Sequence, residues 1–522
     1  MPFKEFVKRR SLKADDTRRT RAAELTLRQS ICPIFLVTIL FFLWGFSYGL
    51  LDTLNKHFQN TLGINAARSA GLQAAYFGAY PLASIGHAAW ILRQFGYRAV
   101  FIWGLFLYAL GALLAIAALK AESFGGFCAC IFIIGNGLGS LETAANPYIT
   151  VCGPPRYSEI RINFSQAFNG IGTVIAPVLG SYVFFNFGDD RAMANVQWVY
   201  LSIAAFVLLL AAVFFFSDIP EITDAGMFFQ RSTLPCRCWG SRQRADRDMA
   251  DMEFQAQETH VGGSADKPFR KQWKLFHAAF AQFCYTGAQV AIASFFINYT
   301  VNTRPGTSDP DASKFFAGAQ AAFALGRFAG VGIMKYVRPR WVFLMFISGV
   351  VIFLIPSITE RGNSGMSMLY VVLFFESICF PTIVALGMRG LGRHTKRGSG
   401  FIVGGVVGGA CVPPATGAAA DYFRERGHRF NYGLAMFVPL IFMGLAWVYA
   451  ACVNFVPEYK HVVDSLGEAD IGISNANNDT VNKGSSTSNK SEKPCEGHDP
   501  GRRAGHKDAG STSAVATASG DS

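Results

Sequence analysis

The sequence is poor in charge for its length. Only 16% of its 522 residues are Asp, Glu, Lys or Arg, whereas 51% are apolar. A soluble globular protein carries about 25% charged residues. The mean hydropathy is positive, at +0.27. This composition excludes an ordinary soluble domain, and it predicts that the lipid bilayer is the solvent of long segments.

The signatures of enzymes and nucleic-acid-binding proteins are missing too. No nucleophile–base pair, metal-ligand spacing or phosphate loop occurs, so we expect no catalysis, metal or cofactor. The net charge of +12 does not indicate nucleic acid, because Lys and Arg gather in the tails and in alternate loops. The first 30 residues are basic and lack the apolar core of a cleavable signal peptide.

What the sequence does contain is apolar runs of membrane-spanning length. A bilayer core needs roughly 20 residues of helix to cross it, and twelve such runs occur: 31–53, 70–92, 99–119, 125–149, 162–186, 196–217, 275–299, 314–335, 341–358, 366–388, 398–420 and 432–455. We therefore predict an all-α membrane protein. Its predicted parts are a basic tail (1–30), a six-helix bundle (31–217), a central loop (218–272), a second six-helix bundle (273–456) and a disordered tail (457–522).

The positive charges predict the orientation. Lys and Arg are concentrated in the tails, the central loop and every second short loop. The positive-inside rule then places both termini in the cytoplasm.

The two halves also share short motifs. E-x4-P occurs at Glu142 and again at Glu376, and G-x4-P-x2-G begins at Gly172 and again at Gly409. The two displacements, 234 and 237 residues, indicate a duplication. Two related bundles predict a solute site between them near the midplane, with access alternating between the two sides.

Three acids in the apolar runs are the candidates for proton coupling or solute binding. A carboxylate in hydrocarbon costs a few kcal/mol, so it must face a cavity, a wet path or a partner. Removal from water also favours the protonated form, which a proton-coupled carrier requires. Asp52 has the alternative of an interfacial cap, Glu142 of a structural hydrogen bond, and Glu376 of a conformational latch.

Amide stripes are the candidates for solute contacts. Asn163, Gln166 and Asn169 are spaced by three and share one helical face. Gln282 and Gln289 are seven apart, with Tyr285 between them. Carboxamides donate and accept hydrogen bonds, which suits sugar hydroxyls. Hydrogen bonding between helices is the alternative for both stripes.

Three arginines lie where helices meet the predicted cytoplasmic face, namely Arg98, Arg161 and Arg327. Anchoring by the positive-inside rule is one interpretation. Gating ion pairs at the cytoplasmic surface are the other.

Several segments together resemble the fucose/galactose/glucose–proton symporter family of the major facilitator superfamily. They are F-F-L-W-G-F…L-L-D-T-L-N, L-F-L-Y-A-L-G-A, G-L-G-S-L-E-T-A-A-N-P-Y, R-I-N-F-S-Q-A-F-N, A-Q-F-C-Y-T-G-A-Q, G-R-F-A-G and F-P-T-I…L-G. The resemblance implies the major facilitator fold and coupling carboxylates at Asp52 and Glu142. It also implies that Gln166, Asn169 and Gln289 look toward a sugar cavity.

The chain departs from the bacterial L-fucose carriers at three positions. It has Leu51 where they have Asn, Cys379 where they have Gln, and an acid at Glu376 where they have none. Fucose itself is therefore not the expected solute. The long tails and central loop look like those of a fungal member, and the plasma membrane is the expected location.

The function that we predict is proton-coupled transport of a sugar or similar small polar solute by a monomer. Two alternatives stay open, namely export of a small metabolite on the same scaffold and a transporter-like nutrient sensor.

Overall fold

The computed structural model describes residues 27–62, 69–121, 123–152, 158–183, 189–217, 219, 268–391 and 394–464. All regular elements in these ranges are helical. Residues 1–471 form one compact unit and residues 472–522 form another. The described residues all belong to the first unit.

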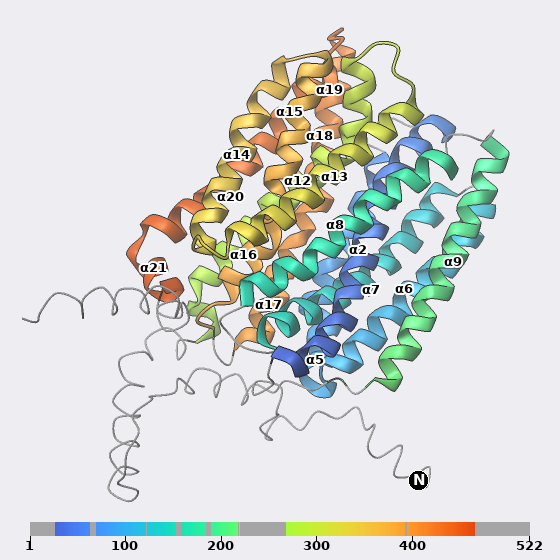
Figure 1. The fold of residues 1–522 in the computed structure, drawn as a ribbon. Helices are drawn as coiled ribbons and strands as arrows, with labels where there is room; N and C mark the ends of the chain where they lie inside the picture. The colour runs from blue at the N-terminus through green and yellow to red at the C-terminus, as the bar shows by residue number, and fades with distance from the viewer. Residues whose placement is uncertain are drawn as a thin grey trace, which may run out of the picture. The chain divides into compact units, whose positions relative to one another are not determined.

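The first half of the chain folds into one series of helices (Figure 1). They are α2 (Leu27–Leu62), α4 (Gly71–Gly78), the π-helix η2 (Leu82–His87), α5 (Ala88–Phe95), α6 (Tyr97–Lys120), α7 (Phe124–Val151), α8 (Ser158–Val183) and α9 (Asp189–Phe216).

The second half folds into another series. It consists of the 3₁₀ turn η4 (Phe269–Lys271), α12 (Trp273–Thr303), α13 (Asp309–Ile333), α14 (Pro339–Thr359), α15 (Gly362–Glu376), α16 (Cys379–Met388), α17 (Thr395–Gly404), the 3₁₀ turn η6 (Gly405–Val407), α18 (Gly408–Glu425), α19 (Asn431–Ala435), α20 (Phe437–Phe455) and α21 (Pro457–Asp464).

Each of the twelve predicted apolar runs coincides with helix. Ten helical segments of the described chain are long and apolar enough to cross a membrane. The other two predicted crossings are the α4–η2–α5 series and α8. The first is interrupted at Gly86, whose backbone is non-helical, and the second carries the polar stripe of Asn163, Gln166 and Asn169.

The outer surface of α9 shows why lipid must be its solvent. Trp198, Leu209 and Phe216 are all exposed, and only 33% of the most apolar stretch of α9 is buried. A continuous apolar face of this kind is rare on soluble monomers.

The repeated E-x4-P motif has a structural consequence in each half. Proline lacks an N–H group and clashes with the carbonyl four residues earlier, so it frees a carbonyl close to the acid. Near Pro147, the Thr143 carbonyl accepts a hydrogen bond from Ser399 Oγ at 3.4 Å. Before Pro381 the helix breaks between α15 and α16, and Tyr285 Oη donates to the Glu376 carbonyl at 2.5 Å.

Close helix crossings recur at equivalent places in the two halves. A Cβ atom on Gly45 of α2 would lie 2.0 Å from the Asn169 carbonyl oxygen of α8. A Cβ atom on Gly408 of α18 would lie 1.9 Å from the Phe283 carbonyl oxygen of α12. Only glycine permits backbones to approach this closely. The crossing of the first and fifth helices therefore matches that of the seventh and eleventh.

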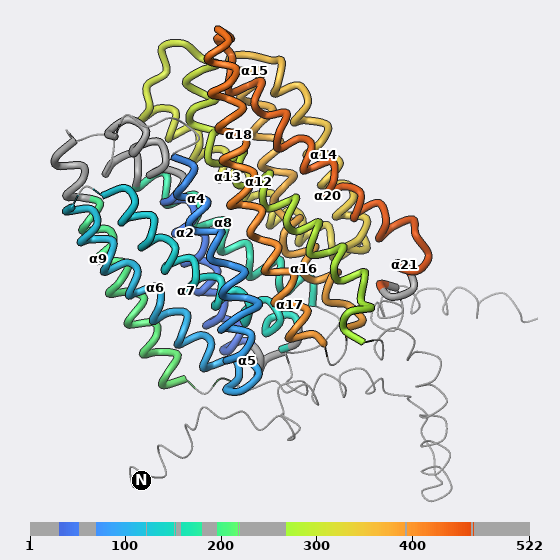
Figure 2. Tube along the Cα trace, turned by 180° about the vertical axis from the view of Figure 1, so that it is seen from behind, coloured from blue at the N-terminus to red at the C-terminus, as the bar shows by residue number. Residues whose placement is uncertain are grey.

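The two halves contact each other through two further matching pairs, α8 with α13 and α4 with α18 (Figures 1 and 2). A second group of contacts joins α17 to η2, α5 and α7. These lie at the end of the helices where Arg98, Arg161 and Arg389 are found, which we call the basic end.

One part of the predicted disordered tail is ordered. Residues 457–464 form helix α21, in which Tyr459 and Val463 are buried. Tyr459 Oη lies 2.5 Å from His277 Nδ1 of α12. Aromatic contacts with Trp273 and Tyr449 pack Tyr459 against α12 and α20.

Candidate functional site

A pocket lies where helices of both halves meet. Its wall is formed by α2, α8, α12, α13 and α15, through Trp44, Tyr48, Asn169, Thr173, Gln289, Ala293, Gln320, Phe323 and Glu376. It holds about 240 Å³ of space, including what is open to solvent.

The helical repeat explains this lining. Trp44 and Tyr48 of α2, Asn169 and Thr173 of α8, and Gln289 and Ala293 of α12 are pairs four residues apart. Such pairs project from one helical face. Trp44 is held by a hydrogen bond from its Nε1 to Tyr80 Oη at 2.5 Å and by stacking on Tyr48 at 5.6 Å.

The polar part of the wall includes three amides that form no side-chain hydrogen bond with the described residues. Asn169 is fully buried, and neither its Nδ2 nor its Oδ1 atom has a hydrogen-bond partner. Among the described residues, no side-chain hydrogen bond is formed by Gln289 or Gln320 either. A buried amide without a partner costs free energy. A bound polar solute would therefore supply the hydrogen-bond donors and acceptors that these amides lack.

Glu142 begins a polar chain that runs from the first half to the second. Its side chain is only 4% exposed, and its Oε1 atom accepts a hydrogen bond from Asn146 Nδ2 at 3.4 Å. Gln166 Nε2 donates to Asn146 Oδ1 at 3.5 Å. Arg327 Nη1 donates to both the backbone oxygen and Oε1 of Gln166, each at 2.8 Å. The chain thus connects α7, α8 and α13.

Arg327 lies deeper than the sequence predicted. It was expected near the cytoplasmic surface, as an anchor or in a gating ion pair, but it is only 2% exposed. It lies six residues from the end of α13, which is about 9 Å along a helix. Its hydrogen-bond partner is the neutral Gln166, and its guanidinium packs 4.7 Å from the Phe323 ring centroid. The surface placement of Arg327 is therefore corrected.

Glu376 takes the equivalent position in the second half. Its side chain is 1% exposed and lines the pocket. Its Oε2 atom has no hydrogen-bond partner. Arg327 acts electrostatically on both Glu142 and Glu376, but it forms no ion pair with either in the described structure.

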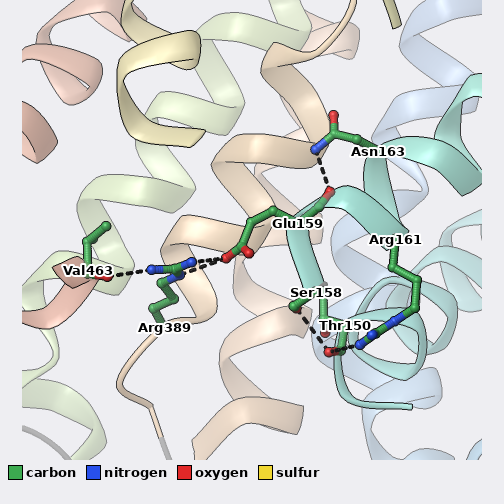
Figure 3. A network of polar contacts seen from close by, with 7 residues as sticks. All are labelled: Thr150, Ser158, Glu159, Arg161, Asn163, Arg389 and Val463. Atoms are coloured by element: carbon green, nitrogen blue, oxygen red, sulfur yellow. Dashed lines mark hydrogen bonds and ion pairs between the residues drawn. The ribbon is translucent and has the colours of Figure 1, made fainter. Parts of the chain in front are cut away.

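At the basic end, an ion pair joins the two halves (Figure 3). Arg389, just after α16, pairs with Glu159 of α8, and its Nε atom lies 2.8 Å from Glu159 Oε1. The same guanidinium donates to the Val463 carbonyl of α21 at 2.5 Å. Arg389 lies in one of the predicted basic loops, but its pairing with Glu159 was not predicted from the sequence.

Arg161, predicted either as a positive-inside anchor or as part of a gating ion pair, bonds to backbone carbonyls of its own half. It donates from Nε to the Ile149 carbonyl and from Nη2 to the Thr150 carbonyl, both at 2.8 Å. These carbonyls lie at the end of α7 (Figure 3), so Arg161 caps that helix within the first half. Arg98 lies partly buried at the start of α6.

Other predicted residues lie outside the pocket wall. Asn163 Nδ2 donates to the Glu159 carbonyl at 2.9 Å, and Gln282 Nε2 donates to Thr286 Oγ1 at 3.2 Å, both within their own helices. Tyr285 supports the break before α16. Asp52 belongs to α2, but its side chain lies outside the described residues.

Sequence reasoning missed Gln320 and Phe323 of α13. The signal was present, because Gln320 is an isolated amide in an apolar helix, three and seven residues before Phe323 and Arg327. Polar side chains in membrane helices generally face the interior or a pathway.

Comparisons with known proteins agree with this architecture. The sequence profile of the Major Facilitator Superfamily matches residues 37–410. The L-fucose-proton symporter of Escherichia coli (strain K12) is 31% identical over 414 residues, which cover 76% of this chain and 88% of that protein. The glucose/galactose transporter of Brucella abortus biovar 1 (strain 9-941) is 31% identical over 395 residues, covering 74% of this chain and 87% of that protein.

Solved structures show the same relationship. The crystal structure of the transporter FucP in the outward conformation superposes with a TM-score of 0.60 and 29% sequence identity. The match covers 81% of this chain and 98% of FucP. A chain built of membrane-spanning helices in two matching halves, with these relatives over most of its length, is a transporter and not an enzyme. It belongs to the Major Facilitator Superfamily and, within it, to the fucose/galactose/glucose–proton symporter family.

Proposed function

We propose that this chain moves a sugar or similar small polar solute across the membrane together with protons. The observation that carries the proposal is a pocket of partnerless amides between the two halves, with a buried acid in its wall and another in the adjoining polar chain. Relatives named as an L-fucose-proton symporter and a glucose/galactose transporter support a sugar as the solute.

Glu142 is the coupling acid in this proposal, together with Asp52. Ionised Glu142 attracts Arg327, which belongs to the other half. Protonation removes that attraction. Gain or loss of one proton therefore changes the free energy of contact between the halves. Such a change is what alternating access requires.

The amides of Asn169, Gln289 and Gln320 bind solute hydroxyls, because each can donate and accept. Trp44 offers an aromatic face for the apolar side of a sugar ring. Gln166 transmits the state of the Glu142–Asn146 pair to Arg327.

The orientation and setting are also proposals. Lys and Arg at the basic end support cytoplasmic termini. The plasma membrane is the proposed location, and a monomer is the proposed working unit because the pocket is built from one chain.

The test is uptake of radiolabelled sugars into proteoliposomes with an imposed pH gradient. External acid should drive accumulation, since each pH unit of the gradient supplies about 1.4 kcal/mol per proton. Glu142→Gln should abolish accumulation. Because Gln mimics the protonated acid, exchange of sugar between the two sides should persist. Glu425→Gln, at an exposed site at the end of α18, is the matched control.

Accumulation that is indifferent to both the gradient and Glu142→Gln would defeat the symport proposal. Binding of sugars without flux would instead favour a sensor.

A further inference from the structure

Glu376 is an acidic group that the proposed coupling does not use. It is 1% exposed, and its Oε2 atom has no hydrogen-bond partner. Its backbone carbonyl is engaged by Tyr285, but its side chain hydrogen-bonds to no described residue. It is the only carboxylic acid among the described residues that line the pocket.

The acidic groups near the pocket outnumber the basic ones. Among the described groups near it, Glu142 and Glu376 supply two acids, and Arg327 supplies one cation. Arg327 directs its Nη1 atom to Gln166 rather than to either acid. An unpaired charge at this depth is costly. Even when Glu142 is protonated and Arg327 is charged, Glu376 has no ion-pair or hydrogen-bond partner for its side chain among the described residues.

The groups around Glu376 are those that recognise an ammonium ion. Trp44, Tyr48 and Phe323 line the same pocket. The faces of aromatic rings attract cations through their quadrupole, and Trp does so most strongly. A carboxylate beside aromatic rings provides both an ionic partner and a low-polarity enclosure for a positively charged amine.

The rest of the wall suits hydroxyl groups. Asn169 offers an unpaired donor and an unpaired acceptor, and Gln289, Gln320 and Thr173 add further polar atoms. A small solute that carries several hydroxyls and one ammonium group would satisfy the amides and the acid together.

We propose that the preferred solute is an amino sugar, whose ammonium group binds Glu376 among Trp44, Tyr48 and Phe323 while its hydroxyls bind the amides. This inference rests on the proposed function, since it names the solute class of the same pocket.

The test compares two ligands that differ at one position, glucose and glucosamine, at slightly acidic pH where the amine is charged. Binding to purified full-length protein is measured by calorimetry, and uptake is measured in the proton-gradient assay. Wild-type protein should bind glucosamine at least tenfold more tightly than glucose. Glu376→Gln should remove this preference, Glu376→Asp should retain part of it, and Glu425→Gln should leave it intact.

Equal affinity of the wild-type protein for both ligands would overturn the inference, and so would a glucosamine preference that survives in Glu376→Gln. If Glu376→Gln does not fold, the wild-type comparison and Glu376→Asp still decide. Proton-driven uptake of glucose without a glucosamine preference would refute only the amino sugar. Absence of proton-driven uptake for every sugar would refute the proposed function itself.

Discussion

At the residue scale, the important side chains are those whose polar atoms form no hydrogen bond with the described residues. Asn169 and Glu376 present polar atoms without protein partners to the pocket. Gln166, in contrast, uses both ends of its amide, since it donates to Asn146 and accepts from Arg327. In the proposed coupling, a change in the protonation of Glu142 in the first half is therefore passed to Arg327 of the second half through Gln166.

Gln166→Glu tests this link at the residue scale. The carboxylate would give Arg327 an ionic partner at the 2.8 Å position now taken by a neutral oxygen, and charged hydrogen bonds are about twice as strong as neutral ones. Each 1.4 kcal/mol or so of added stability for this conformation shifts its population about tenfold. We expect a higher melting temperature and at least tenfold slower transport.

The isosteric Gln166→Met lacks the side-chain acceptor and serves as the comparison. It should melt at a lower temperature than wild type. If Gln166→Glu transports at the wild-type rate, the contact with Arg327 does not limit the conformational change.

At the scale of helices, the repeated motifs explain most of the features that the two halves share. Each E-x4-P motif places an acid near a backbone carbonyl that accepts a side-chain hydrogen bond, and each half has a glycine crossing between its first and fifth helices. These features follow from local chemistry and could be predicted. The interruption of the second helix at Gly86 could not, because it depends on packing against α17 and α7.

Gly45→Ala tests the crossing of α2 and α8. Its methyl group would meet the Asn169 carbonyl oxygen at 2.0 Å, and neither backbone can yield without moving a helix. Overpacking of this kind costs about 1–3 kcal/mol, so the melting temperature should fall and sugar binding near Asn169 should weaken. Gly444→Ala in α20, with no atom within 4 Å of the new methyl group, should melt like wild type. Equal effects of the two substitutions would contradict the close crossing.

At the scale of the whole molecule, the two halves are tied at the pocket and again at the basic end. The Arg389–Glu159 pair is the second tie, with side-chain exposures of 17% and 9%. The basic loops could be predicted from the sequence, but this ion pair could not. The partners are 230 residues apart, and only the packing of α8 against α16 brings them together. For the same reason, the sequence did not reveal that Gln320 and Asn169 line the same pocket.

Glu159→Gln should weaken this tie by about 1–3 kcal/mol, because a largely buried Arg389 loses its ionic partner. We expect a lower melting temperature and a shift toward the conformation that is open at the basic end. Hydrogen exchange of the backbone of α17 should rise accordingly.

The exchanged pair Glu159→Arg with Arg389→Glu should recover part of the loss. Lys314→Gln, which breaks the exposed pair with Asp311, should change nothing measurable. If the exchanged pair behaves no better than the single variant, the effect does not come from the ionic contact.

The docking of α21 also bears on how the protein is prepared for experiments. The last membrane-spanning helix ends at Phe455, yet Val463 supplies a carbonyl to Arg389 and Tyr459 packs beside His277. A C-terminal truncation should therefore retain residues through Asp464, and an affinity tag or fluorescent reporter belongs beyond that point.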